Sequence, residues 1–468
     1  MTSVVAGRWR ERIVGLDERV PLLDGRRVPY VNLDNAASTP PLRDVVEAVQ
    51  RFLPFYASVH RGSGYKSRLS TAAYDEAHRT VARFVGADPD TAAVVFGKNA
   101  TEAINKLAHR YPLPEGSVVV TTLMEHHSNE LPWRGRAQVV RAGLLPDGRL
   151  DEEHLDLLLS RHAGRVALVT VSGASNVTGF VQPVHRLAAK AHAVGARILV
   201  DAAQWAPHRP IDVRPADDPE HLDYIALSAH KLYAPFGTGA LVGRPDVFLR
   251  GAPEYRGGGT VERVWLDDVE WAGLPDREEA GSPNVMGAVA LAAAADALME
   301  TGLDALSRHE QALTAYALER LAGVPGLRLY GDADPSRVAD RVGVIPFNLD
   351  GVPHGLVAAI LGYEFGIGVR HGCFCAQIYV AHLLGIPEAA RRRSADEKPG
   401  MVRVSFGAYN TPEEVDALVD ALQRVRRGAQ GGRYRRGADG EYAPDGAQNP
   451  FVIPVSIDER VVSCTSFT

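Results

Sequence analysis

Short runs of β-branched and other apolar residues alternate in this chain with longer segments whose apolar positions recur at helical spacing. VHRLAAKAHAVGA (184–196) shows the helical spacing, whereas the apolar runs have the length of buried strands. This alternation predicts an α/β fold, with a mostly parallel sheet covered by helices, in a large domain over residues 31–294. The strand-like runs are TAAVVF (91–96), GSVVVTT (116–122), RVALVTVS (165–172), ARILVDA (196–202) and LDYIALS (222–228).

The pattern changes after residue 294, where long helical periodicity and separate strand-like runs replace the regular alternation. We predict a smaller α+β domain over 295–426, with residues 1–30 forming an N-terminal segment that packs on it. Its expected elements are one long helix over 289–323, a helix over 354–365, and strands over 341–349 and 366–370.

The segment after residue 426 is rich in Gly and Arg and offers almost nothing to bury, and it ends in the mildly apolar FVIPVSIDERVVSCTSFT (451–468). Such composition predicts a flexible linker and tail over 427–468, ending in a short docking segment.

Charge and composition narrow the class of partner. The net charge is −6, with no long basic block ahead of the tail, so neither nucleic acid nor an anionic membrane is implied. No apolar run reaches the roughly 18 residues of a membrane span, and the N-terminus lacks the apolar stretch of a secretory signal. We therefore expect a cytoplasmic protein that acts on small molecules.

One lysine stands out in the stretch YIALSAHKLYAPFGTG (224–239). Only six of the 51 basic residues are lysine, and Lys231 lies at the end of an apolar run. An arginine stays protonated in a protein, whereas a lysine at an apolar edge can lose its proton and act as an amine nucleophile, as a Schiff base requires. The alternative is a lysine that caps the strand end and extends its ammonium group to solvent.

Polar residues at neighbouring strand ends match the needs of pyridoxal phosphate. Asp201 ends the run ARILVD, and ligands of parallel sheets bind beyond the carboxyl ends of strands. A carboxylate there can hold the pyridine nitrogen protonated, while Gln204 and Asn176 can approach the phenolic oxygen. Ordinary alternatives are a helix N-cap for Asp201, a first-turn polar residue for Gln204 and a turn residue for Asn176.

A phosphate site is predicted where VVFGKNATEAIN (94–105) passes from a strand into a helix that starts near Thr101, because free N–H groups and the helix dipole favour an anion. Ser228 and His230 are further candidates for phosphate contacts.

In TTLMEHHSNELPW (121–133), His126 can stack on the cofactor ring or be a plain surface histidine. A metal site made of His126 and its neighbour is excluded, since adjacent residues of extended chain point in opposite directions.

Eight motifs, taken in order, resemble the class V aminotransferase family of fold-type I pyridoxal-phosphate enzymes. Within that family the chain is most similar to cysteine desulfurases that carry the reactive cysteine in an R-x-G-x-x-C-A motif. The resemblance covers about residues 30–425. The motifs are ATEAIN (100–105), MEHHSN (124–129), SNVTG (175–179), VDAAQ (200–204), SAHKLYAPFGTG (228–239), RGGG (256–259), EAGSPN (279–284) and VRHGCFCAQ (369–377).

The resemblance implies a role for each candidate in cofactor binding. Lys231 forms the Schiff base, Asp201 meets the pyridine nitrogen, and His126 stacks on the ring. It also implies a homodimer in which Ser282 reaches the neighbouring subunit's phosphate. The residues near the phenolic oxygen are Gln204 and Asn176, and those around the phosphate are Ala100, Thr101, Ser228 and His230.

The substrate side of the site rests on Cys375, which occupies the family's nucleophile position. A thiolate there can attack the sulfur of a bound cysteine, with His126 as the candidate for proton transfer. A buried, inert thiol is the ordinary alternative. Arg403 matches the family's carboxylate-binding arginine, with a surface salt bridge as the alternative. Arg370 is a second candidate for that role, and Asn176 is a further candidate for substrate binding.

Two further cysteines have less defined roles. Cys373 makes the motif GCFC, which looks more like molybdenum cofactor sulfurases, although the chain has no room for their additional domain. Cys373 can act as a resolving thiol or simply pack, and Cys464 can relay sulfur on the tail. Two thiols do not make a metal site, so we expect no metal.

The leading hypothesis is a pyridoxal-phosphate-dependent cysteine desulfurase, which converts L-cysteine to L-alanine and leaves a persulfide on Cys375 for an acceptor protein or pathway. The alternative is a C–S or C–Se lyase, or another amino-acid-converting enzyme of the family, which releases pyruvate and ammonia or another product. A third hypothesis is a non-catalytic dimeric scaffold that carries sulfur, and a purified protein without yellow colour supports it.

Overall fold

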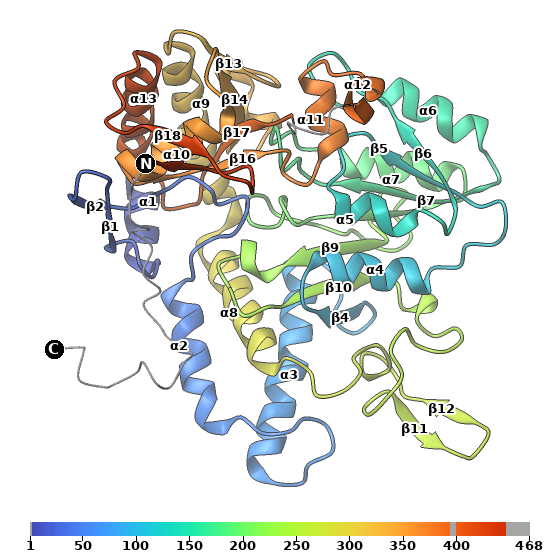
Figure 1. The fold of residues 1–468 in the computed structure, drawn as a ribbon. Coiled ribbons are helices and arrows are strands. Elements are labelled where there is room, and N and C mark those ends of the chain that lie inside the picture. The colour runs from blue at the N-terminus through green and yellow to red at the C-terminus, as the bar shows by residue number, and fades with distance from the viewer. Residues whose placement is uncertain (1, 394–398, 446–468) are drawn as a thin grey trace.

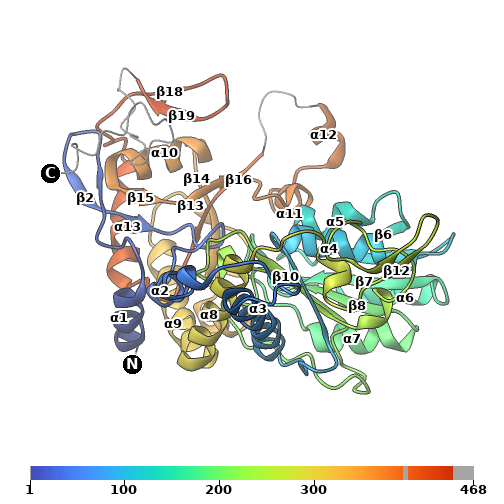
Figure 2. The same ribbon diagram turned by 90° about the horizontal axis from the view of Figure 1, so that it is seen from below.

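The computed structural model describes residues 2–393 and 399–445, which form two lobes (Figures 1 and 2). The larger lobe is built on a seven-stranded sheet with the order β4-β10-β9-β8-β7-β5-β6. Neighbouring strands from β9 to β6 are parallel, and only β10 runs antiparallel to both of its neighbours. The mostly parallel α/β sheet predicted from the sequence is therefore confirmed. The strands are β4 (Ala93–Gly97), β5 (Val118–Thr122), β6 (Gln138–Ala142), β7 (Val166–Ser172), β8 (Arg197–Asp201), β9 (Tyr224–Ser228) and β10 (Gly239–Gly243).

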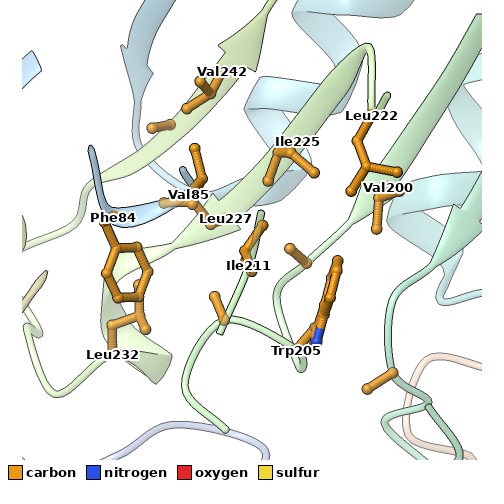
Figure 3. Close-up of a cluster of buried hydrophobic side chains, with 14 of the residues drawn as sticks. Phe84, Val85, Val200, Trp205, Ile211, Leu222, Ile225, Leu227, Leu232 and Val242 are labelled. Atoms are coloured by element: carbon orange, nitrogen blue, oxygen red, sulfur yellow. The ribbon is translucent and has the colours of Figure 1, made fainter. Parts of the chain in front are cut away.

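Helices cover both faces of this sheet, which is why its strands are apolar on both sides. Alternate strand residues such as Val200 and Ile225 pack with α3, α7 and α8 in one large cluster (Figure 3), and the residues between them, such as Leu199, pack with α4 on the other face. The helices of this lobe are α2 (Arg43–Phe52), α3 (Tyr65–Phe84), α4 (Ala100–Arg110), α5 (His127–Glu130), α6 (Glu152–Arg161), α7 (Val184–Ala193) and α8 (Val285–Thr301).

The smaller lobe has a four-stranded antiparallel sheet with the order β13-β14-β17-β16, and its core is a separate apolar cluster. Residue Leu33 belongs to this cluster, because β3 (Val31–Asn32) pairs with β15 (Ile367–Gly368). The other elements are β13 (Leu327–Leu329), β14 (Val344–Leu349), β16 (Arg370–Gly372), β17 (Met401–Ser405), α9 (Leu303–Ala322), α10 (His354–Phe365), α11 (Gln377–Leu383), α12 (Glu388–Arg393) and α13 (Pro412–Arg426).

The single long helix predicted over 289–323 is wrong. The chain forms two helices, α8 and α9, that meet at Gly302 with a bend of 77°. Gly302 has φ +82°, in the left-handed region that glycine adopts without steric cost, so the helix ends there and a new one begins. Among the described residues no single helix is long and apolar enough to span a membrane, and the bent pair α8 and α9 passes only as a pair, by length and composition.

The segment at the start of the described chain packs against the smaller lobe. The helix α1 (Thr2–Arg12) contacts α9, and Arg10 forms a 2.7 Å ion pair with Glu414. A hairpin follows it, made of β1 (Arg19–Pro21) and β2 (Arg27–Pro29). These contacts accord with an N-terminal segment on the small lobe, whereas the domain boundaries at 30, 294 and 426 stay predictions.

The described part of the segment after α13 is more ordered than a flexible linker. Residues 434–444 form a hairpin of β18 (Tyr434–Arg436) and β19 (Tyr442–Pro444) that lies against α10 (Figures 1 and 2). The Glu364 carboxylate on α10 accepts hydrogen bonds from the N–H groups of Gly431 and Gly432 and from the Tyr434 hydroxyl. A second hairpin, β11 (Val261–Val264) and β12 (Val269–Trp271), extends from the large lobe (Figure 1). The predicted docking segment and Cys464 lie outside the described residues.

Candidate active site

A pocket of about 330 Å³ lies beyond the carboxyl ends of β7, β8 and β9, where residues from both lobes meet. Its wall contains every site residue predicted from the sequence except Ser282. Those residues are Ala100, Thr101, His126, Asn176, Asp201, Gln204, Ser228, His230, Lys231, Arg370, Cys375 and Arg403. Ser282 lines a different hollow with His60 and Gly259, so its predicted contact with a neighbouring subunit stays a prediction.

Lys231 ends a short 3-10 turn (Ala229–Lys231) that directly follows β9, and this turn carries its side chain into the pocket. Burial lowers the pKa of Lys231 to about 8, although the Asp201 carboxylate acts in the opposite direction. A larger fraction of the amine is therefore neutral near pH 7 than for an exposed lysine. This position in the pocket wall does not fit a lysine that only caps the strand end and extends its ammonium group to solvent.

Asp201 is the last residue of β8 and is 6% exposed. Its Oδ1 accepts a hydrogen bond from the Ala203 N–H at 3.0 Å. Burial raises the pKa of Asp201, while the Ala203 N–H and the Lys231 ammonium act in the opposite direction. An acid and a base thus share one pocket, and each lowers the cost of ionising the other.

Backbone and hydroxyl groups gather at the start of α4. Asn99 caps this helix by accepting the Glu102 N–H, and the Ala100 N–H donates to the Ser228 hydroxyl at 2.8 Å. The hydroxyl groups of Thr101 and Ser128 form a hydrogen bond of 2.7 Å. The start of β10 lies very close to the backbone of Asn99, which requires glycine at position 239, because a Cβ atom there would lie 2.5 Å from Asn99. This arrangement of donors at a helix N-terminus suits a phosphate group.

His126 lies on the pocket wall at the N-terminus of α5, and its Nδ1 accepts the Ser128 N–H at 3.1 Å. The neutral ring therefore carries its proton on Nε2. Burial lowers the pKa of His126 to about 3, and the positive charges of Lys231 and Arg403 add to this effect. At neutral pH the residue is an uncharged imidazole, which suits stacking on a cofactor ring.

The loop of Cys375 is held by groups of the same pocket. The His127 N–H donates to the Cys375 carbonyl oxygen at 2.8 Å, and the Asn176 side-chain amide donates to the Phe374 carbonyl oxygen at 2.7 Å. Phe374 and Cys375 both have φ values near +54°, which side-chain-bearing residues rarely adopt and which cost free energy. The Cys375 residue is exposed, so its thiol has access to the pocket and to solvent.

Cys373 occupies a different environment from Cys375. It is half-buried and packs against the apolar cluster that includes Met124 and Tyr379, and it is not part of the pocket wall. Of the two roles considered for this thiol, packing has the structural support. The described residues contain no group of three or more metal-ligating side chains.

Arg403 is 3% exposed and stacks on the Phe374 ring, with its guanidinium carbon 4.9 Å from the ring centroid. It donates to the Asn176 carbonyl oxygen at 2.9 Å, and its buried Nε has no hydrogen-bond partner among the described residues. Burial lowers the pKa of Arg403 to about 10, against the effect of Asp34, so the group stays charged at neutral pH. A charged guanidinium group with an unpaired N–H donor suits a substrate carboxylate.

Two acidic residues that sequence reasoning missed belong to this region. Asp34 contacts both Arg403 and Arg370. Glu125 is 5% exposed and accepts hydrogen bonds from Thr122, Asn129 and Ser172, and burial raises its pKa to about 7. For Glu125 the available signal was its place in MEHHSN next to His126, whereas Asp34 in LDNAA lies next to no site residue predicted from the sequence.

Comparisons with known proteins agree on one family. A family model described as aminotransferase class-V matches residues 31–418. A cysteine desulfurase of Haloferax volcanii is 38% identical over 89% of this chain and 94% of its own, and a probable cysteine desulfurase of Streptomyces coelicolor is 38% identical over 86% and 93%. The apo structure of a cysteine desulfurase from Thermococcus onnurineus NA1 covers 90% of this chain and 98% of its own, with a TM-score of 0.77 and 32% identity.

Proposed function

Because this chain belongs to the class V aminotransferase family, we propose that it is a pyridoxal-phosphate-dependent cysteine desulfurase that forms L-alanine and a persulfide on Cys375. One observation carries the proposal. Lys231, Asp201 and the loop that carries the Cys375 thiol lie around the same pocket. The charged Arg403 also lines this pocket. A cofactor amine, its counter-ion, a nucleophile and a carboxylate site are the groups that this reaction needs.

The residues of the pocket fit pyridoxal phosphate. The Gln204 Oε1 is buried without a hydrogen-bond partner among the described residues, although its Nε2 donates to the Ala36 carbonyl oxygen. Lys231 would be the amine that attaches the cofactor, Asp201 would lie against its ring nitrogen and His126 would cover the ring. The phosphate is assigned to Ala100, Thr101, Ser228 and His230 at the start of α4. When bound, the cofactor withdraws electrons from the α-carbon of the amino acid.

The chain's own groups provide the other steps. With a pKa of about 8, roughly a tenth of Lys231 is neutral at pH 7, compared with well under a thousandth at its ordinary pKa of 10.5. Arg403 binds the substrate carboxylate through its fork. His126 carries its proton on Nε2 and its Nδ1 accepts the Ser128 N–H, so it lines the pocket as a hydrogen-bond donor, and the proton transfer expected of it from the sequence stays a prediction.

Cys375 performs the sulfur transfer. Its thiolate attacks the sulfur atom of bound cysteine, so a new S–S bond forms on the enzyme while the Cβ–S bond of the substrate breaks. The electrons of the broken bond stay on the carbon fragment, which takes up protons and leaves as alanine. The accessible Cys375 loop at the edge of the pocket supports this role, and an acceptor protein then removes the sulfur.

The test is a pair of variants, Cys375→Ser and Cys373→Ser, purified as holoenzymes. We expect Cys375→Ser to keep the visible absorbance of the cofactor and to lose both alanine formation and the extra sulfur atom that mass spectrometry finds after incubation with L-cysteine. Cys373→Ser should keep both. Undiminished sulfur transfer in Cys375→Ser would reject the role, and pyruvate with ammonia in place of alanine from the native enzyme would favour a lyase.

A homodimer is also proposed. Leu53, Phe55, Tyr56 and Tyr65 leave between 42% and 73% of their surface exposed in one segment, and apolar surface of this kind commonly meets a partner. Light scattering during size-exclusion chromatography tests the proposal, and a monomer at micromolar concentration contradicts it.

We further propose a cytoplasmic location, which fractionation of the native cells tests.

A further inference from the structure

Asp34 lies behind two arginines that face the substrate pocket. Its Oδ1 is 3.1 Å from an Nη of Arg403, and its Oδ2 is 2.9 Å from an Nη of Arg370. Both arginines belong to the pocket wall, whereas Asp34 does not. The carboxylate therefore contacts both guanidinium groups without itself lining the pocket.

The position of Asp34 is fixed by backbone contacts of its own segment. The residue forms an isolated parallel β-bridge with Ser405, and its N–H donates to the Asn32 side chain at 3.1 Å. The next residues are also tied to the small lobe, because the Ala36 N–H donates to the Ser405 hydroxyl at 2.8 Å. A carboxylate held in this way is a constant part of the site's electrostatic field.

The three side chains have a net charge of +1, because two arginines share one carboxylate. A substrate amino acid with a neutral side chain brings one carboxylate and matches this charge. A second carboxylate on the substrate has no uncompensated cation here, since Arg370 is already paired. In the proposed holoenzyme, Lys231 and Asp201 would be engaged by the cofactor, so neither belongs to this set of three side chains.

We propose that Asp34 restricts the pocket to amino acids with a single carboxylate by compensating one of the two arginine charges that face the substrate. The inference rests on the proposed function, because it assumes that the pocket binds an α-amino acid. It makes Asp34 a specificity-determining residue that acts through Arg370 and Arg403. A salt bridge that only held the lobes together would not discriminate between ligands of equal size and different charge.

L-Aspartate and L-asparagine are the matched probes, since they have nearly the same size and differ by one negative charge. Their dissociation constants are measured on the holoenzyme from the change of visible absorbance on rapid mixing, with L-alanine as a reference. In Asp34→Asn, one arginine charge is released and the substituted side chain keeps its shape. We expect the affinity ratio of aspartate to asparagine to rise about five- to tenfold, the gain of one partly exposed charge-assisted contact.

Two further variants follow the same charge balance. The double variant Asp34→Asn with Arg370→Gln returns the net charge to +1, so the ratio should return to within about twofold of the native value. Arg370→Gln alone lowers the net charge to zero, so the ratio should fall below the native value. This single variant also keeps the test decisive if Asp34→Asn does not fold.

Asp44→Asn is the control, because Asp44 holds a similar two-pronged pair with Arg12 away from the pocket. It should leave the ratio unchanged. A ratio in Asp34→Asn that stays within twofold of the native value overturns the inference, as does a gain that persists in the double variant. A native holoenzyme that binds neither L-alanine nor L-cysteine would instead refute the proposed function, so the two failures are distinguishable.

Discussion

Removing the ammonium group of Lys231 should stabilise the apoenzyme at neutral pH, even though it removes the residue that attaches the cofactor. The perturbation is Lys231→Met, which keeps the length of the side chain and removes its charge. Burial lowers the pKa of Lys231 from 10.5 to about 8. At about 1.4 kcal/mol per pKa unit, the buried ammonium destabilises the native state by about 3 kcal/mol. The side chain keeps partial contact with the open pocket, so we expect about 2 kcal/mol.

The sign and pH range follow from the two pKa values. Below pH 8 the lysine is protonated in both the native and the unfolded state, and the full penalty is present. Between pH 8 and 10.5 the unfolded state binds more protons than the native state, so native stability rises with pH and the penalty disappears. The advantage of Lys231→Met over the native apoenzyme should therefore be complete at pH 7 and absent above about pH 10.5.

The assay is urea unfolding of the two apoenzymes, followed by circular dichroism at pH 7 and at pH 10.5. Lys190→Met is the control, because Lys190 pairs at the surface with Asp156 at 2.8 Å and its loss should cost up to about 1 kcal/mol at pH 7. The reasoning is refuted if Lys231→Met is no more stable than the native apoenzyme at pH 7. A difference that does not shrink with rising pH would refute it as well.

Three other substitutions have definite expected outcomes. Asp201→Asn should slow alanine formation by about 10- to 100-fold, because it removes the charge opposite the cofactor ring, and steady-state kinetics at saturating cofactor measure this. Tyr409→Phe should cost about 1–2 kcal/mol in urea unfolding, because the buried hydroxyl donates to the Asn35 side chain at 2.7 Å. Glu364→Ala should release the β18–β19 hairpin, and limited proteolysis with mass spectrometry should then find faster cleavage within residues 427–445 while circular dichroism stays unchanged.

The strands predicted from the sequence were those buried on both faces, since a continuous apolar run such as VALVTVS leaves little room for another interpretation. The edge strand β6 was missed because it is only partly buried over most of its length and contains Gln138 and Arg141. The strand β10 was missed as well, because the short apolar run in GALVG lies between two glycines, and glycine is depleted in strands. The break at Gly302 depended on a backbone angle that composition does not report.

Site residues close to each other in a motif were predictable, because the ends of parallel strands meet at one edge of the sheet. Asp34 and Glu125 were missed for a common reason. The partners of Asp34 lie more than 300 residues away, at Arg370 and Arg403, and their meeting depends on the bridge to Ser405. Glu125 is held by Ser172 on another strand, and a glutamate in a polar motif ordinarily lies in solvent.

The pairing of β3 with β15 affects the order in which the protein can fold during synthesis. Leu33 leaves the ribosome early, yet the cluster that covers it is built from residues of the last third of the chain. The large lobe can fold as a unit as soon as its own strands have emerged, whereas the small lobe must wait until its residues up to Val425 have emerged and then recruit the N-terminal strand. Until that moment an apolar strand edge stays uncovered on the nascent chain, where a chaperone can bind it.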